Sequence, residues 1–413
     1  MPSTRSRRSA RTLVASGATL AVVLVGAAAA TAASHHPATL YVSPSGHHGA
    51  RDVSCATAAY PAIHGALSAA APGSTVIVCP GTYHEDVALA KRVKLQGRQA
   101  VIDALGLTNG IHVTASSAQV AGFTVMNAQG EGILVGSVVP PVASAKKVLA
   151  VKNVTVANNV VENNDLGALL AHPTYPQCQA QGQIPGDCGE GIHLDGAIGT
   201  RVVGNTVSGN SGGILITDEA GPSALNVIDR NTVVANLYDC GVTLAAHNPN
   251  VVSAGKTHQA IGGVYRNTVS NNYAIGNGTK GEGAGVLIAT AAPGTAAFDN
   301  TVSGNVLASN ELSGVTIHAH SPGVNISGNR ILGNDIFTNN TGAGDFPNGP
   351  GHGDTATTGV LVYSAVLPVS VTIAHNQIVA NAVGVWRTTN VSTPGIASNS
   401  FVSVGTNVVV SAP

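Results

Sequence analysis

The feature that most constrains this chain is a repeated unit of about two dozen residues. Each copy has an asparagine, a second asparagine five residues later, and a glycine that opens an alternating apolar segment, as in residues 201–218. The first asparagines are Asn159, Asn205, Asn231, Asn267, Asn305, Asn329, Asn376 and Asn399. The second are Asn164, Asn210, Asn236, Asn272, Asn310, Asn334 and Asn381, and the last copy has Val404 instead. Short β-branched segments between such turns are typical of a solenoid with parallel coils.

The repeated glycine begins the most regular segment of each coil. These glycines are Gly191, Gly213, Gly241, Gly285, Gly314, Gly359 and Gly384. Alternate side chains of a strand share a face, so the first and third residues after each glycine should point inward. We therefore expect Val207, Ile214, Ile216 and Leu244 to be buried, while Arg387 interrupts the inner pattern in the last coil. Asparagine and glycine tolerate the left-handed backbone of sharp bends, so we expect the asparagines there. Stacked asparagine side chains can also hydrogen-bond to one another along each column.

The pattern Asn-x-Val…Asn…Gly-Ile-x-Leu resembles that of right-handed parallel β-helix proteins of the pectate-lyase-like type. The resemblance covers roughly residues 75–410. It implies an all-β fold, a single right-handed parallel β-helix of about ten coils, which we assign to residues 75–413. In enzymes of this fold the substrate groove lies along a strand face that loops border. The repeat is specific for the fold and not for one activity.

The N-terminal part carries two further signals. Residues 1–33 have four arginines, an apolar run and a small-residue site, which predicts a secretory signal peptide and a secreted, extracellular protein. That apolar run is short for a membrane span, and we expect no span elsewhere. Residues 34–74 form a lead-in with a first strand at Thr39–Val42. Within it, residues 59–71 have apolar side chains at helical spacing, which predicts a short helix that caps the open end of the solenoid.

The composition fits stacked coils and excludes one class of partner. The chain is 44% hydrophobic, 9% charged and only 3% aromatic, so Val, Ile, Leu and Ala must fill the core. Its formal net charge is −1. Proteins that bind nucleic acid generally present a basic face, so we do not expect a nucleic-acid partner.

The five cysteines are consistent with an oxidising compartment. The pairs we expect are Cys55–Cys79 and Cys178–Cys188. The second pair would close a short loop and brace an insertion. Cys240 would then be an unpaired, buried, small apolar residue beside Gly241.

Insertions mark one strand face of the solenoid as the working side. They lie at about residues 166–190, 274–284 and 340–358, and a fourth lies at about 247–262 at the other end of the same strands. Long loops in an otherwise economical repeat are usually functional or disordered, and per-repeat insertions map to one face.

Acidic and histidine residues gather on that face, and we predict the catalytic site there. The candidates are His193, Asp195, Asp218, Glu219 and His247. Neighbouring coils are about 4.8 Å apart, and paired carboxylates at this range of separations serve glycoside hydrolysis as acid and as base or nucleophile. A nearby histidine can exchange a proton near neutral pH. The alternative is that these residues are solvated strand ends and turns.

A second group could bind substrate. It consists of His318, His320 and Tyr363 on the strand face and of His352 and Asp354 in the third insertion. His318 and His320 face the same way, with Tyr363 one coil on, so they could also chelate a metal. The tripeptide around His352 resembles the Gly-His-Gly of polygalacturonase-type hydrolases, whose other motifs are absent. We assign no metal ligands. A Ca²⁺ cofactor is left open, although no contiguous oxygen-ligand loop is present.

The leading hypothesis is a secreted β-helix protein that binds a polysaccharide or cell-wall glycan along the loop-bordered face, with hydrolysis or elimination as the reaction. No Arg or Lys lies on the predicted face before Arg387, which disfavours a lyase that relies on basic residues. One alternative is a non-catalytic extracellular or cell-wall-associated binding or structural protein. Another is an exported metal-handling protein that uses some of the fifteen histidines.

Overall fold

The computed structural model describes residues 36–48, 50–136, 150–167, 190–280, 283–290, 292–340 and 357–413. Residues 36–413 form one compact unit. The predicted signal peptide therefore lies outside the described residues, as do the Cys178–Cys188 pair and residues His352 and Asp354.

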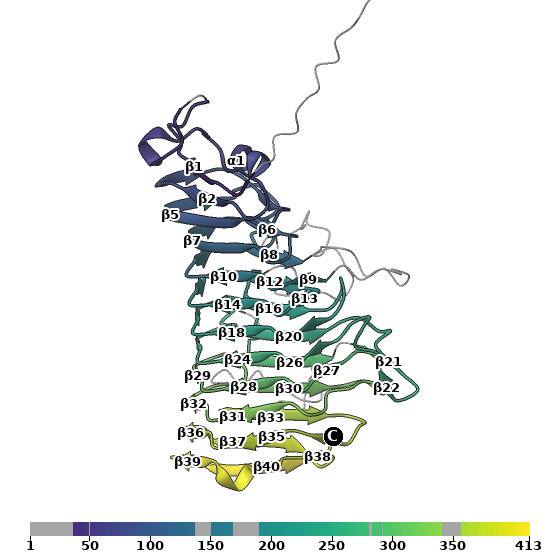
Figure 1. The fold of residues 1–413 in the computed structure, drawn as a ribbon. Coiled ribbons are helices and arrows are strands. Elements are labelled where there is room, and N and C mark those ends of the chain that lie inside the picture. Colours follow the sequence, from purple (N-terminus) through teal and green to yellow (C-terminus); the bar gives the residue numbers. More distant parts are fainter. Residues whose placement is uncertain are drawn as a thin grey trace, which may run out of the picture. The chain divides into compact units, whose positions relative to one another are not determined.

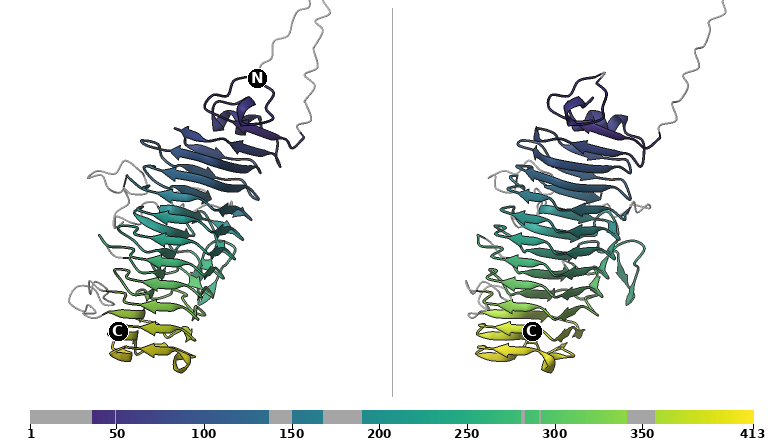
Figure 2. Two further views of the ribbon diagram at one scale, coloured as in Figure 1. Left: turned by 90° about the vertical axis from the view of Figure 1, so that its left-hand side faces the viewer. Right: turned by 60° about the vertical axis from the view of Figure 1, so that its left-hand side comes forward.

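The described chain is a right-handed parallel β-helix, as the repeat predicts (Figure 1). One coil runs through β12 (Glu190–Asp195), β13 (Ala197–Ile198), β14 (Arg201–Val203) and β15 (Thr206–Ser208), and then enters the next coil at β16 (Gly212–Thr217). Each strand pairs in parallel with its counterpart in the next coil, so that Ile192 lies beside Ile214 and Ile214 beside Val242. Figure 2 shows the stack from two further sides.

The strands form three stacked sheets. The long-strand sheet contains β4 (Val87–Leu89), β6 (Ile111–Val113), β8 (Ile133–Gly136), β12, β16, β20 (Val242–Ala246), β26 (Val286–Thr290), β30 (Val315–Ala319), β33 (Thr358–Ser364), β37 (Val383–Thr388) and β40 (Thr406–Ser411). The short-strand sheet contains β9 (Val151–Lys152), β13, β17 (Ser223–Ala224), β23 (Val264–Tyr265) and β27 (Ala297–Phe298).

The third sheet, the two-column sheet, holds two strand columns that the long strands β5 (Lys94–Asp103) and β7 (Gln119–Met126) join. One column also contains β1 (Thr39–Val42), β2 (Thr75–Val78), β10 (Thr155–Ala157), β14, β18 (Val227–Asp229), β24 (Thr268–Ser270), β28 (Thr301–Ser303), β31 (Arg330–Leu332) and β35 (Thr372–Ala374). The other also contains β3 (Gly81–Tyr83), β11 (Val160–Glu162), β15, β19 (Thr232–Val234), β25 (Tyr273–Ile275), β29 (Val306–Ala308), β32 (Asp335–Phe337), β36 (Gln377–Val379) and β39 (Ser400–Val402).

Buried asparagines form three ladders between the strands, not two. The first is Asn159, Asn205, Asn231, Asn272, Asn305, Asn334, Asn376 and Asn399. The second is Asn164, Asn210, Asn236, Asn277, Asn310, Asn339 and Asn381. The third is Asn226, Asn267, Asn300 and Asn329. The expected columns are therefore wrong in two coils. There Asn267 and Asn329, expected in the first column, belong to the third ladder, and the first ladder passes five residues later through Asn272 and Asn334.

The left-handed backbone lies one residue before the ladder position. Arg230 and Ala235, for example, have φ values of 52° and 53° and precede Asn231 and Asn236. The expectation that the ladder asparagines themselves take the left-handed bend is wrong. Their side chains are needed for a different reason: each Oδ1 accepts hydrogen bonds from both the backbone N–H and the side-chain amide of the preceding asparagine, as Asn231 does for Asn205.

The inner columns are confirmed. Val207, Ile214, Ile216 and Leu244 are fully or almost fully buried. The strand-opening glycines are required by close packing, since a Cβ at Gly213 would collide with the carbonyl oxygen of Gly241 in the next coil.

Arg387 lies in the inner column beside Val362, and its Nη1 donates to the carbonyl of Val391 at 2.6 Å. The last coil contains β37 and also β38 (Val391–Ser392), which pairs with β34 (Val369–Ser370). A one-turn 3-10 helix at Ile396–Ser398 precedes β39.

A short helix covers the N-terminal end, as expected. Helix α1 (Ile63–Ala69) buries Ile63, Ala66 and Leu67 against the core. Glu85 accepts the N–H groups of Ile63 and His64 at the start of the helix, and Lys91 donates to carbonyls at its end. These contacts satisfy helix ends that otherwise lack partners.

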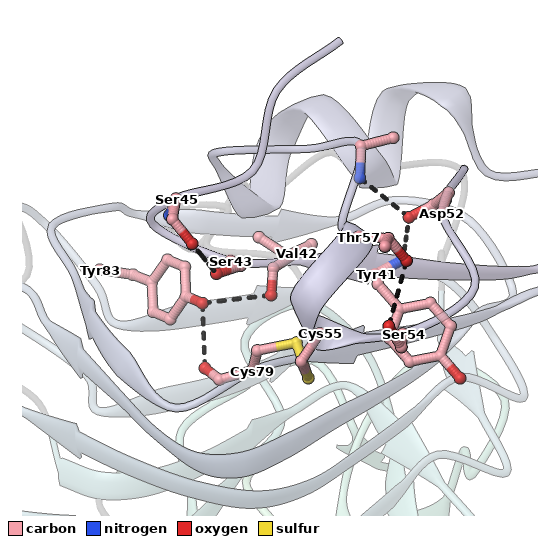
Figure 3. The surroundings of a disulfide bond; sticks show 11 residues. Tyr41, Val42, Ser43, Ser45, Asp52, Ser54, Cys55, Thr57, Cys79 and Tyr83 are labelled. Carbon is pink, nitrogen blue, oxygen red and sulfur yellow. Dashed lines mark hydrogen bonds between the residues drawn. A yellow bond between two sulfur atoms is a disulfide. The ribbon is translucent and has the colours of Figure 1, made fainter. Parts of the chain in front are cut away.

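The predicted disulfide between Cys55 and Cys79 is present, and it ties a 3-10 turn (Cys55–Thr57) to the end of β2 (Figure 3). The hydroxyl of Tyr83 donates to the carbonyl oxygen of Cys79 at 2.9 Å. Cys240 is a free, buried cysteine, also as predicted. No helix in the described part of the chain is long and apolar enough to cross a membrane.

The fourth insertion is a β-hairpin that projects from the stack (Figure 1). Strands β21 (Val252–Ser253) and β22 (Lys256–Thr257) pair antiparallel around Ala254 and Gly255, which both have positive φ, as a tight two-residue hairpin turn requires. The second insertion is shorter than expected, because residues 273–275 form the regular strand β25.

Candidate functional site

The candidate site lies on the outer face of the long-strand sheet, at the carboxyl ends of β12, β16 and β20. Register places Asp195 beside Thr217 and His193 beside Leu215. His193 and Asp195 are buried, although strand parity directs both away from the core. The sequence therefore predicts their direction correctly, but they are not open to solvent.

His193 is held from both sides. Its Nδ1 lies 2.8 Å from Oε1 of Glu131, and its Nε2 lies 2.8 Å from the hydroxyl of Thr217. The other oxygen of Glu131 accepts the backbone N–H of Glu190 at 2.6 Å. Burial alone would lower the pKa of His193, but Glu131, Asp195 and Glu219 together raise it to about 9. His193 is therefore a buried imidazolium at neutral pH.

Asp195 is the buried acid of the site. Its Oδ1 accepts the backbone N–H of Ala220 at 2.8 Å. Burial and the charge of Glu219 raise the pKa of Asp195 well above its usual value. A carboxyl group with a raised pKa retains its proton and can donate it.

Glu219 and His247 form the part of the site that solvent can reach. Oε1 of Glu219 lies 2.5 Å from Nδ1 of His247, and their side chains are 22% and 25% exposed. Burial raises the pKa of Glu219, but the charge and hydrogen bond of His247 and the charge of His193 lower it to about 2. Glu219 is thus the stronger acid of the two, because the pKa of the neighbouring Asp195 is shifted in the opposite direction.

Asp218 has a different environment from the other acids. It is fully buried, and it accepts the backbone N–H groups of His247 at 2.6 Å, Asn248 at 3.1 Å and Gly263 at 2.6 Å. Burial and Glu219 raise its pKa to about 6, against the opposing effect of these N–H groups. Asp218 fastens both ends of the β21–β22 hairpin to the stack, and its oxygens are occupied by backbone donors.

The second predicted group is partly assembled by the structure. His318 lies beside Tyr363 in register, the rings of His318 and His320 are 5.1 Å apart, and those of His320 and Tyr363 are 5.0 Å apart. Nε2 of His318 is buried and has no hydrogen-bond partner. Burial and His320 lower the pKa of His318 to about 3, and burial lowers that of His320.

No group of three or more His, Cys, Asp or Glu side chains in the described segments is arranged to hold a metal ion. The order of the coils separates the two predicted groups. Strand β26 separates β20, which precedes His247, from β30, which contains His318. The acidic cluster and the histidine pair are therefore distinct sites on one face.

Comparison with known proteins places the chain in a family. The sequence profile of the periplasmic copper-binding protein (NosD) family matches residues 68–254 and 225–413, which together span most of the chain. The chain belongs to the NosD family. No curated protein matches this NosD-family chain in sequence. The family is periplasmic, and together with the disulfide this is consistent with a location outside the cytoplasm.

Two solved structures share the fold of this NosD-family chain. The A-module of mannuronan C-5 epimerase AlgE4 from Azotobacter vinelandii has 14% identity and a TM-score of 0.52, over 82% of this chain and 90% of that chain. The A-module of AlgE6 from the same organism has 18% identity and a TM-score of 0.50, over 84% and 93% of the two chains. At this identity the similarity concerns the fold alone.

Several residues of this NosD-family site are not among those that the sequence pattern predicts. Glu131 and Glu190 stand directly before strand glycines and stack on one another in successive coils. Asp239 is buried, its pKa is raised by burial, and it shares a hydrogen bond with Glu190. The available signal was the position just before the strand glycine, where acidic residues occur in two successive coils.

Proposed function

We propose that this exported protein binds a polysaccharide along the outer face of the long-strand sheet and catalyses proton transfer at a sugar ring. The observation that carries the proposal is the partly exposed Glu219–His247 pair beside the buried Asp195, whose pKa is raised. Hydrolysis and elimination both need an acid and a base with separated pKa values. Perturbed carboxyl groups that cluster at an accessible edge are typical of such sites.

In this proposal each residue has a separate role. Glu219 stays ionised and fixes the orientation of the His247 ring through Nδ1, which leaves Nε2 of that ring to exchange a proton with substrate. Asp195 donates its proton to the departing oxygen. Glu131 and Thr217 hold His193 through its two ring nitrogens. The positive charge of His193 favours the ionised form of Glu219. Asp218 acts as a positioning residue, because it holds the backbone of His247.

The test is a screen of purified protein against acidic and neutral polysaccharides that reads both reducing ends and the absorbance of unsaturated products. On a substrate identified in this way, Glu219→Gln and His247→Gln should lower turnover by ~10²–10⁴-fold. Asp335→Asn is the matched control, because Asp335 is an exposed carboxylate on the two-column sheet. Full activity of both site variants would refute the assignment, and binding without any product would favour the non-catalytic alternative.

We also propose that the chain binds copper, which the family match favours. The donors in the described residues restrict where copper could bind. The free Cys240 is disfavoured as a copper ligand. Burial and Asp239 raise the pKa of its thiol, and its sulfur already accepts the N–H of Ala284. Imidazole is a suitable copper ligand, and the buried, unpartnered Nε2 of His318 fits this role. The test is the copper content of the purified protein after equilibration with the metal and removal of the excess.

A further inference from the structure

We infer that His318 and His320 are the ligands that hold copper in this protein, with Tyr363 packed against the site. This inference rests on the copper binding proposed above and assigns it to one position on the fold. It is independent of the acidic cluster, which lies at the ends of β12, β16 and β20.

Strand parity brings the two histidines together on one side. His318 points outward from β30 and His320 follows two residues later, so both side chains leave the same face. In register, His318 has Ala289 on one side and Tyr363 on the other. The ring of Tyr363 lies against that of His320, with 5.0 Å between the ring centres. His320 is exposed and gives an ion access from solvent.

The spacing of the rings already suits a shared metal ion. Their centres are 5.1 Å apart and their planes make an angle of 76°. Two imidazoles that bind one metal at about 2.0–2.1 Å with tetrahedral angles hold their ring centres roughly 5 Å apart. Binding therefore needs adjustment of side chains alone and no movement of the strand.

A buried ring nitrogen without a partner favours an ion at this place. Nε2 of His318 is buried and has no hydrogen-bond partner, and a buried polar atom without a partner costs about 1–3 kcal/mol. A metal ion supplies the missing partner. Three other imidazoles of the described chain already have partners, since His64 contacts Glu85, His193 contacts Glu131 and His258 contacts Ser253. His318 and His320 are the two histidine rings of the described residues that contact each other.

The test uses Cu(I) as the probe under anaerobic, reducing conditions, in competition with a coloured chelator. The wild-type protein should bind Cu(I), and its X-ray absorption spectrum should show nitrogen neighbours. His320→Ala and the double variant His318→Ala/His320→Ala should lose at least about tenfold in affinity, because even residues that only support a ligand contribute about that much. His258→Ala, which removes an exposed histidine from the hairpin, should bind as the wild type does.

Each outcome decides a separate point. If the wild type does not bind Cu(I), copper binding itself is refuted. If it binds and the double variant binds equally well, or if the spectrum shows sulfur neighbours, copper binding stands and its assignment to this pair is overturned. His320→Ala guards against misfolding as the cause of a loss, because this side chain is exposed and its removal should leave the melting temperature unchanged.

Discussion

At the scale of single residues, the protonation of His193 links the candidate site to stability. Its raised pKa of about 9 means that the folded protein binds this proton more tightly than the unfolded chain, where the value is near 6.5. The contribution to stability is therefore complete below about pH 6.5, and it is lost as the pH rises through about 9.

We accordingly expect the free energy of unfolding to fall between pH 6.5 and pH 9, and we expect this fall to be smaller in His193→Gln. Glutamine can still hydrogen-bond to Glu131 or Thr217 but carries no proton that titrates. Chemical denaturation of both proteins across this pH range measures the difference. Parallel curves for the two proteins would show that His193 does not carry the charge.

At the scale of elements, the asparagine ladders tie each coil to the next. Oδ1 of Asn231 accepts both the backbone N–H and the side-chain amide of the buried Asn205. Asn231→Ala leaves both donors without a partner inside the protein. Because each unsatisfied buried donor costs about 1–3 kcal/mol, we expect a loss of about 2–6 kcal/mol in the free energy of unfolding.

Asn250→Ala is the control for the ladder, since Asn250 is exposed in the hairpin and no ladder passes through it. Thermal and chemical unfolding of the two variants measure the difference. Equal stabilities would mean that the ladder hydrogen bonds do not contribute to the free energy of unfolding.

The hairpin is the second element with a clear expectation. Asp218 accepts three backbone N–H groups at the two ends of the hairpin segment. Asp218→Asn removes the negative charge that strengthens all three bonds, and its NH₂ group cannot accept the bonds of the oxygen that it replaces. We expect faster amide exchange at His247, Asn248 and Gly263, with little change in the neighbouring strand β20. Unchanged exchange at these three amides would contradict the structural role of Asp218.

At the scale of the whole molecule, each coil contacts mainly its neighbours, so damage at one end should stay local. Cys55 and Cys79 are 24 residues apart in sequence and secure the N-terminal end. Replacing both by serine should cost about 3 kcal/mol where that end unfolds cooperatively with the rest.

Hydrogen exchange should show where the loss occurs. We expect faster exchange in β1, β2 and α1 and unchanged exchange near β30, because many coils separate the two regions. A uniform acceleration along the chain would show that the solenoid unfolds as a single unit instead.

Much of the fold and part of the site could be predicted because each depends on local order. Strand parity alone placed Ile214 and Ile216 inside and His318 and His320 on one outer face. Glu131 could not be predicted as the partner of His193, because 62 residues separate them and an insertion of unknown path lies between. Whether a carboxyl group meets solvent, an imidazole or backbone N–H groups also depends on distant coils. The sequence therefore could not show that Asp218 accepts backbone N–H groups while its neighbour Glu219 binds an imidazole.

The sequence by itself determined the coil, its inward columns, the disulfide and the capping helix, since each follows from short-range periodicity or spacing. The tertiary structure alone decided the register of the asparagine ladders. A spacing of five residues repeats within each coil, so Asn267, Asn272 and Asn277 fit the sequence pattern equally well. Only the parallel pairing of strands between coils, which bonds Asn272 to Asn231 and Asn305, selects one register. The physical reason is that hydrogen bonds between coils depend on three-dimensional stacking, which a self-similar sequence leaves open.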